Sequence, residues 1–212
     1  MKRRNAKTPS GRLQRPRRTL MLGIVAGVAL IGALTGALVA YEGGIGAPPP
    51  ARAATIGGPF ELVDQDGRTV TDASYRGKWL LIYFGYTHCP DACPTALNDM
   101  AQALEGLGAQ RAKVQPLFIT VDPERDTPSV LKDYTAAFQA DIVGLTGSAA
   151  QIAEAARRFR VYYKRDDATN PDYTMSHSSV IYLMDPDGRF VTNFTHETAP
   201  NVIHAKLVQT LS

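Results

Sequence analysis

Residues 79–94 read WLLIYFGYTHCPDACP, and this stretch decides the fold. Its first part, WLLIYFG, is a continuous apolar run rich in aromatic residues, as expected for a strand that is covered on both faces of a sheet. The two cysteines of the chain, Cys89 and Cys93, follow directly. Pro94 suits the first position of a helix, because its missing N–H would have no partner there. The stretch therefore predicts a central strand and a helix, joined by a loop that carries both thiols.

The pattern on both sides of this stretch alternates between strands and helices. Apolar residues recur at spacings of three and four after Pro94, Thr127-Pro128 combines a cap with a helix-starting proline, and Ser148 with Gln151 forms a capping-box pattern. The other expected elements are strands at 114–121 and 142–145, hairpins of 60–63 with 68–71 and of 179–184 with 190–194, and a helix from about Pro200. This order predicts an α/β fold of the thioredoxin-like type, a central mixed sheet with flanking helices and an extra hairpin.

The N-terminal part has the composition of a membrane anchor. Eight of the 23 basic residues lie within residues 1–19, and the 21 residues from 20 to 40 carry no charge. As a helix rising about 1.5 Å per residue, the uncharged segment would cover the roughly 30 Å hydrocarbon core of a bilayer. Basic flanking residues stay on the side of synthesis, which predicts a single-pass protein of the inner (cytoplasmic) membrane whose domain faces the periplasm or another extracytoplasmic space. The alternative is a secretory signal cleaved near Ala51-Arg52-Ala53, although its apolar region would span only about 7–15 residues.

The predicted organisation has four parts. They are a basic cytoplasmic segment at 1–19, a transmembrane anchor at 20–40, a Gly/Pro-rich linker at 41–54 and a thioredoxin-like domain at 55–212. From Glu42 onward the chain has 15 basic and 20 acidic residues, so the pI of 8.9 comes from the N-terminus. Nucleic acid is therefore not an expected partner of the domain.

The cysteine pair needs an explanation other than scaffolding. Cys89 and Cys93 alone make no disulfide framework, and a bridge that closes so short a loop would remove little entropy. Cys93 is expected at the N-cap of the helix, where free N–H groups would lower its pKa and favour the thiolate. Two soft sulfur ligands suit Cu(I) or Zn, but a closed zinc site usually has four protein ligands. A third ligand must then come from the four histidines.

His177 is the strongest candidate for that third ligand. It closely precedes the expected strand at 179–184, and in a thioredoxin-like arrangement the loop before this strand lies beside the cysteine loop. Two thiolates with one imidazole suit copper. The competing interpretation of His177 is a hydrogen-bonded histidine of the core.

Other soft or basic residues are weaker candidates. His88 adjoins Cys89, but neighbouring side chains point in opposite directions in extended backbone. His196 and His204 have the pattern of surface residues. Met175 offers a thioether, although packing is the commoner role of such a residue.

Asp122 is a candidate for an outer-shell role. It follows the strand at 114–121, at the edge of the sheet where both cysteines are expected, so it would support the metal site or a docking partner. The alternative is that Asp122, Arg125 and Asp126 brace a turn through mutual hydrogen bonds.

Three motifs in order resemble the Sco/SenC family of copper chaperones for cytochrome c oxidase assembly. They are GYTHCPDACP at 85–94, TVDPERDTP at 120–128, and SHS at 176–178 followed by YLMDPDG at 182–188. The first motif is highly specific, and the resemblance covers residues 55–211 as well as the single N-terminal anchor. It implies copper ligands at Cys89, Cys93 and His177, and delivery of one copper ion to the dinuclear copper centre of cytochrome c oxidase.

Three functions are open from the sequence. The first is a metallochaperone that binds Cu(I) or Cu(II), with cytochrome c oxidase subunit II as the implied recipient and other copper chaperones as further partners. The second is a thiol:disulfide oxidoreductase that reduces the cysteines of that target through the redox-active pair Cys89 and Cys93, itself restored by a thioredoxin-like reductant. The third, a peroxidase or redox sensor, rests on fold analogy alone. His177 discriminates them, because thiol exchange needs no imidazole and a three-coordinate copper site does.

Overall fold

The computed structural model describes residues 27–37, 55–167, 169–170 and 172–211. The chain divides into two compact units, Met1–Arg52 and Ala53–Ser212. In the first unit, residues 27–37 are helical. Of the described helices, none is both long and apolar enough to cross a membrane. The predicted anchor at 20–40 lies partly, and the predicted linker at 41–54 wholly, outside the described residues.

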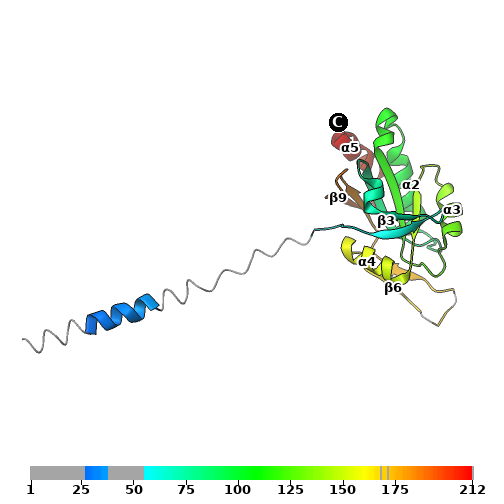
Figure 1. Ribbon diagram of the computed structural model, residues 1–212. Helices are drawn as coiled ribbons and strands as arrows, with labels where there is room; N and C mark the ends of the chain where they lie inside the picture. The colour runs from blue at the N-terminus through cyan, green and yellow to red at the C-terminus, as the bar shows by residue number, and fades with distance from the viewer. Residues whose placement is uncertain (1–26, 38–54, 168, 171, 212) are drawn as a thin grey trace, which may run out of the picture. The chain divides into compact units, whose positions relative to one another are not determined.

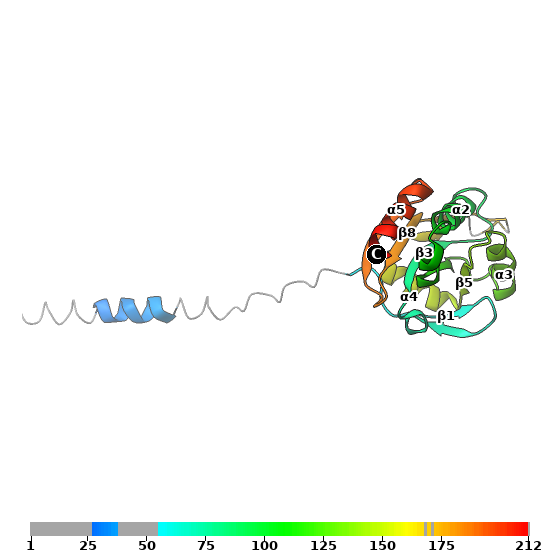
Figure 2. The ribbon, with the colours of Figure 1, turned by 90° about the horizontal axis from the view of Figure 1, so that it is seen from above.

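The second unit, in which Figure 1 labels β3 and β9, is built on a seven-stranded mixed sheet with the order β2-β1-β5-β4-β3-β8-β9. Its parallel strands are β3 (Trp79–Gly85), β4 (Val114–Thr120) and β5 (Val143–Thr146). Its antiparallel additions are β1 (Glu61–Asp64) and β2 (Thr69–Thr71) beyond β5, and β8 (Val180–Met184) and β9 (Phe190–Thr195) beyond β3. Figure 2 shows β3 between β8 and β1. The thioredoxin-like α/β architecture, the buried interior strand and both hairpins are thus as predicted.

The helices that cover the sheet are α2 (Ala92–Leu104), α3 (Pro128–Ala136), α4 (Ala149–Phe159) and α5 (Pro200–Leu211). Tyr83 and Phe84 are neighbours in β3 and point to opposite faces of the sheet, so their ring contacts show which helix covers which face. Tyr83 stacks on Phe118 of β4, whose ring meets Tyr134 of α3. On the opposite face, Phe84 packs on Phe159 of α4. The α2 helix lies on the same face as Tyr83, and α5 packs against α2.

Two of the predicted helix starts are confirmed. Thr127 Oγ1 accepts a hydrogen bond from the N–H of Val130 ahead of α3, and Pro128 is the first residue of that helix. Ser148 and Gln151 form the expected capping box of α4. Two local patterns therefore fix where the chain turns into these helices.

The start of α2 differs from the prediction. The helix begins at Ala92, after Asp91, so the expectation that Pro94 opens it is wrong. Pro94 is tolerated as the third helical residue because none of the first four N–H groups of a helix has an intrahelical partner. Cys93 consequently lies inside the first turn and not at the N-cap.

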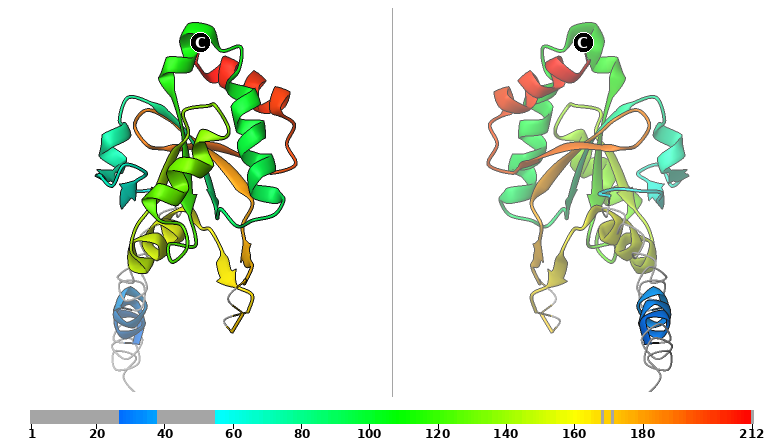
Figure 3. Two further views of the ribbon diagram at one scale, coloured as in Figure 1. Left: turned by 90° about the vertical axis from the view of Figure 1, so that its right-hand side faces the viewer. Right: turned by 90° about the vertical axis from the view of Figure 1, so that its left-hand side faces the viewer.

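Two short strands form a sheet separate from the seven-stranded one. β6 (Tyr163–Arg165) and β7 (Met175–His177) pair antiparallel, with Tyr163 opposite His177. Figure 3 shows this pair projecting from the domain, and we call β6, β7 and the described residues between them the arm. The sequence does not predict the arm, since three-residue strands of mixed polarity carry no period.

The carboxylate of Asp64 closes the β1–β2 hairpin. Its Oδ1 accepts hydrogen bonds from the backbone N–H groups of Asp66 and Arg68, both at 2.9 Å, and its Oδ2 accepts from Arg68 Nε at 2.8 Å. Burial acts to raise the pKa of Asp64, but the hydrogen bonds and the Arg68 charge outweigh it and lower that pKa. The folded state therefore favours the ionised carboxylate.

We expect Asp64→Ala to lower the free energy of unfolding at neutral pH by about 1.5–3 kcal/mol, the range for hydrogen bonds to charged groups. The folded-state pKa lies below the ordinary value of 3.8. The contribution is therefore present above about pH 4 and is lost as the pH falls through the folded-state pKa. Urea denaturation should show the difference from wild type shrinking in acid.

Asp66→Ala is the matched control for this prediction. Its carboxylate takes part in ion pairs with the exposed Lys132 and Arg68, and such pairs contribute at most about 1 kcal/mol. Equal losses of stability in both variants would contradict the role assigned to Asp64.

Candidate metal centre

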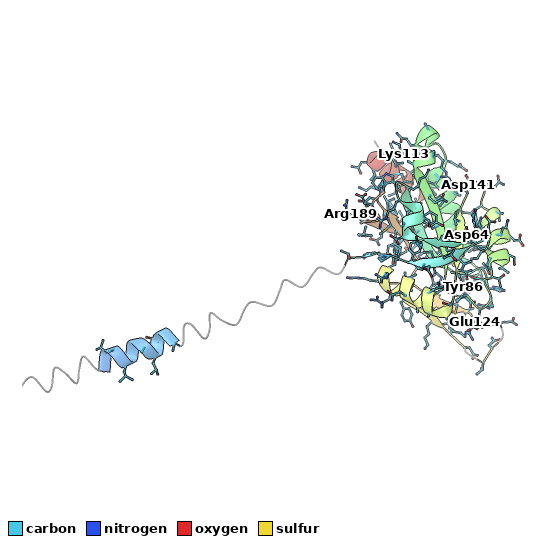
Figure 4. All side chains as sticks on the ribbon, viewed as in Figure 1. Asp64, Tyr86, Lys113, Glu124, Asp141 and Arg189 are labelled. Atoms are coloured by element: carbon cyan, nitrogen blue, oxygen red, sulfur yellow. The ribbon has the colours of Figure 1, made fainter. Side chains whose placement is uncertain are left out.

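The site lies at the edge of the sheet where the parallel strands β3 and β4 end. Figure 4 shows Lys113, which precedes β4, and Glu124, which follows it, at opposite ends of the domain, with Tyr86 at the Glu124 end. The α2 helix begins at this same edge, so its free N–H groups face the loop that joins it to β3. A helix N-terminus in this position favours an anion.

A buried carboxylate holds the cysteine loop in place. Asp126 is fully buried and accepts hydrogen bonds from the hydroxyls of Thr87 and Thr120, both at 2.6 Å, and from the N–H of Thr87 at 3.1 Å. Burial raises the pKa of Asp126, while these hydrogen bonds act to lower it. The loops that follow β3 and β4 are thereby joined to each other.

The sulfur of Cys93 is buried against the bare backbone of β3. A Cβ atom at Gly85 would lie 2.7 Å from Cys93 Sγ and 2.9 Å from the Phe118 ring, both closer than atoms approach. Gly85 therefore leaves the space that the sulfur fills. The hydroxyl of Tyr83 lies 4.0 Å from the same sulfur.

Cys89 is the half-buried member of the pair and the one that favours the thiolate. The backbone N–H of Cys93, in the first turn of α2, donates to Cys89 Sγ at 3.4 Å. A hydrogen bond from the Cys93 thiol lowers the pKa of Cys89, assisted by His177 and by backbone N–H groups, and these outweigh the effect of burial. Cys89 is therefore the nucleophile that the geometry supports.

The expectation that the pKa of Cys93 is depressed is wrong. Hydrogen bonding to Cys89 and burial raise the pKa of Cys93. The cause is the start of α2 at Ala92: as the second helical residue, Cys93 offers its N–H at the helix terminus while its sulfur is buried in the core. The anion-stabilising N–H groups consequently act on Cys89.

His177, the last residue of β7, completes the group. Its Nε2 lies 3.4 Å from Cys93 Sγ, and its Nδ1 lies 3.2 Å from the carbonyl oxygen of Ser178. A proton on Nδ1 that is donated to this carbonyl leaves the Nε2 lone pair directed at the thiols. The rings of Tyr83 and Tyr86 meet the imidazole edge-on, with centroids 6.1 and 5.8 Å away. These contacts fix the plane of the imidazole.

The ligand atoms of Cys89, Cys93 and His177 all lie within 4.8 Å of one another. Metal–sulfur bonds of about 2.3 Å place trigonal ligands about 4 Å apart, so the group fits one soft ion after a small closure. Across the described residues, it is the one cluster of three or more Cys, His, Asp or Glu side chains with ligand spacing. The structure thus brings together the three residues that the sequence singled out.

The other candidate histidines lie outside this cluster of ligand atoms. His88 is exposed, and its Nδ1 lies 3.1 Å from the hydroxyl of Thr87. Met175 is buried in the hydrophobic core. His204 Nδ1 lies 2.9 Å from the carbonyl oxygen of Ala103, between α5 and α2.

Asp122 also lies outside the cluster of ligand atoms. It is buried, its Oδ2 accepts a hydrogen bond from Arg125 Nε at 2.5 Å, and its Oδ1 accepts from the hydroxyl of Tyr173 at 2.6 Å. The bond to Arg125 braces the turn after β4, which is one of the two roles expected. The bond to Tyr173 reaches the arm, which the sequence does not predict.

Sequence reasoning missed the residues that surround the ligands. Tyr83 belongs to an apolar run that does not mark it as special, Gly85 ends that run, and Tyr86 and Tyr173 stand among loop residues. One signal was available: a glycine inside a strand often marks a close approach.

A thioredoxin-like domain with two thiols and one imidazole at the edge of its sheet defines a class of soft-metal-binding proteins. A model of the SCO1/SenC family matches residues 48–212, and the chain belongs to this family.

Individual relatives agree with this assignment. The SCO2-like protein of Rickettsia felis is 43% identical over 150 residues, which are 70% of this chain and 73% of that protein. The structure is similar to that of copper-bound ScoI of Bradyrhizobium japonicum, with a TM-score of 0.68 and 49% identity over 73% of this chain and 98% of that one. It is also similar to BsSco, described as a Sco-family cytochrome c oxidase assembly protein with a disulfide switch, with a TM-score of 0.61 and 28% identity over 75% of this chain and 95% of that one.

We expect iodoacetamide to alkylate Cys89 much faster than Cys93 in the reduced protein. Only the thiolate reacts, and Cys89 combines partial exposure with a lowered pKa, whereas Cys93 is buried with a raised pKa. Between about pH 8 and pH 6 the rate at an ordinary thiol falls roughly 75-fold. The rate at Cys89 should fall far less, since its pKa is lower. Timed quenching and peptide mass spectrometry measure both rates, and equal reactivity of the two cysteines would contradict the assignment.

Proposed function

We propose that this protein binds one copper ion through Cys89, Cys93 and His177 and delivers it to the dinuclear copper centre of cytochrome c oxidase, with subunit II as the recipient. The observation that carries the proposal is the convergence of the three ligand atoms within 4.8 Å. The copper-bound form of ScoI, 49% identical to this chain, supports copper as the ion. The description of BsSco as a cytochrome c oxidase assembly protein supports the recipient.

The donor set favours copper over zinc. A closed zinc site uses four protein ligands, whereas this cluster offers three in the described part of the chain. Thiolates are good ligands for Cu(I), and imidazole is a good ligand for copper in general. Cys93 is buried, while Cys89 and His177 are half-buried, so one side of the site stays within reach of another protein. A three-coordinate site with one accessible side suits an ion that is handed on.

The thiol pair also supports a second function, the reduction of a disulfide in the target protein. Cys89 has the lowered pKa and partial exposure of an attacking thiolate, and Cys93 lies beside it to resolve the mixed disulfide. The net step transfers two electrons from the Cys89 thiolate and the Cys93 thiol to the target disulfide, and the two target thiols take one proton from Cys93 and one from the solvent. A thioredoxin-like dithiol partner would then restore the pair. This activity prepares a target for metal and is compatible with copper delivery.

The proposed location is the outer side of a membrane. The uncharged residues 20–40, preceded by eight basic residues, support a single-pass anchor in the inner (cytoplasmic) membrane. The domain would then face the periplasmic or extracytoplasmic side. Other copper chaperones in that compartment are the proposed donors of the ion.

We expect His177→Ala to weaken Cu(II) binding by more than the about 10–100-fold that is typical of losing an outer-shell partner, because it removes a direct ligand. Dithiol exchange by Cys89 and Cys93 should persist, since it needs no imidazole. Competition with a chromophoric chelator measures the affinity, and X-ray absorption should show two sulfur ligands and one nitrogen ligand in the wild type. His196→Ala, just after β9, is the control. Unchanged Cu(II) affinity in His177→Ala, or a metal surrounded by oxygen and nitrogen alone, would overturn the proposal.

We expect the oxidised protein to take up no stoichiometric copper. Formation of the Cys89–Cys93 disulfide passes two electrons to the oxidant, releases the proton of the Cys93 thiol and leaves no thiolate to bind the metal. A dithiol reductant restores the reduced cysteines, and copper uptake should be restored with them. Copper bound after desalting can be counted with and without prior reduction. Equal, tight uptake by the two samples would refute this dependence.

A further inference from the structure

The position of His177 depends on how the arm is held, because the arm belongs to a separate sheet. Cys89 and Cys93 are placed by the junction of β3 with α2, where Cys93 is buried in the core and Cys89 packs against it. His177 ends β7, which pairs with β6 and not with the seven-stranded sheet. The two sulfur ligands therefore belong to the β3–α2 junction, whereas the imidazole belongs to the arm.

A cluster of charged and aromatic side chains joins the arm to the turn after β4. Tyr173 is buried, and the guanidinium carbons of Arg125 and Arg165 lie over its ring, 3.6 and 3.9 Å from its centroid. The Tyr173 hydroxyl donates to Asp122 Oδ1 at 2.6 Å. Arg165 also pairs with Glu124, so both charges over the ring are matched by carboxylates of the same turn.

Arg125 connects this cluster to the imidazole as well as to the arm. Its Nη1 donates to the backbone carbonyl of Tyr173 at 3.0 Å while its Nε bonds to Asp122. Its guanidinium carbon also lies 5.9 Å from the centroid of the Tyr86 ring, and that ring meets the imidazole of His177 edge-on. Arg125 therefore contacts both Tyr173 of the arm and the Tyr86 ring, and these two residues support His177.

We propose that Tyr173 and Arg125 are positioning residues that hold His177 at the two thiols. The inference rests on the proposed function of the site and adds the means by which its third ligand is placed. Removing the donor of a buried hydrogen bond is costly, because the acceptor stays out of water and loses a partner. Asp122 is 2% exposed, so the loss of its Tyr173 partner cannot be made good by water without movement of the arm.

The test compares Tyr173→Phe and Tyr173→Leu in the full-length, reduced protein. The first keeps the ring beneath the guanidinium groups and removes the bond to Asp122, whereas the second removes both interactions. Tyr134→Phe is the matched control, because the Tyr134 hydroxyl is buried and has no hydrogen-bond partner among the described residues. Urea denaturation establishes that each variant is folded.

The first readout needs no metal. Diethyl pyrocarbonate modifies exposed imidazoles, and peptide mass spectrometry gives the rate at His177 with His196 as the internal reference. We expect the rate of His177 modification in Tyr134→Phe to equal that of the wild type. It should be higher in Tyr173→Phe and highest in Tyr173→Leu. An unchanged His177 rate in a folded Tyr173→Leu variant would overturn the inference.

The second readout separates placement of His177 from general loss of structure. We expect Tyr173→Leu to weaken Cu(II) binding by about 10–100-fold, as for other losses of an outer-shell partner. Cu(I) binding, which depends mainly on the thiolates, should weaken several-fold less. Equal weakening for both ions would mean that Tyr173 supports the whole domain, and it would overturn the inference.

The proposed function and this inference fail in distinguishable ways. If His177→Ala leaves Cu(II) affinity unchanged, the ligand assignment fails, while the metal-free rate still reports whether Tyr173 holds His177. If His177→Ala loses Cu(II) but Tyr173→Leu behaves as wild type in both readouts, the inference alone is wrong.

Discussion

The buried carboxylate of Asp126 is the interaction on which the site depends. β3 and β4 run parallel, so the segments that follow them leave the sheet side by side, beyond the last hydrogen bonds of the ladder. Asp126 joins these segments by accepting both the Thr87 and the Thr120 hydroxyl at 2.6 Å. Such a group must be fully paired, because an unpaired buried polar group costs several kcal/mol. The place of Cys89, two residues after Thr87, follows from this pairing.

The two thiols are chemically different because of where α2 begins. Cys93 fills a space that exists only because Gly85 has no side chain, and it is shielded from solvent on every side. Cys89 stands in front of the helix terminus and receives its N–H groups. The buried sulfur of Cys93 is therefore suited to holding a metal ion. The sulfur of Cys89 is suited to exchange, either of a metal ion or of a disulfide partner.

Local patterns in the sequence were enough for most of the fold and for the identity of the cluster, but not for its fine geometry. The run at 79–85 reads as a buried strand because both faces are covered, and Ser148 with Gln151 caps α4 by a purely local hydrogen bond. Pro94 is equally acceptable as the first or third residue of a helix, so the start of α2 was misplaced and a lowered pKa was wrongly expected for Cys93. The bond between Tyr173 and Asp122 joins residues 51 positions apart, and no spacing pattern encodes it.

The separation of the arm from the main sheet has a consequence for dynamics. An ion held by all three side chains would cross-link two parts of the domain that belong to separate sheets. Ligand present at a thousandfold excess over its Kd stabilises the closed form by about 4.1 kcal/mol, and this acts first on the part with the lowest opening free energy. Amide hydrogen exchange in β6 and β7 would then report whether the site is filled, while exchange in β3 would not. On this argument, filling the site would change the opening of the arm and leave the seven-stranded sheet as it is.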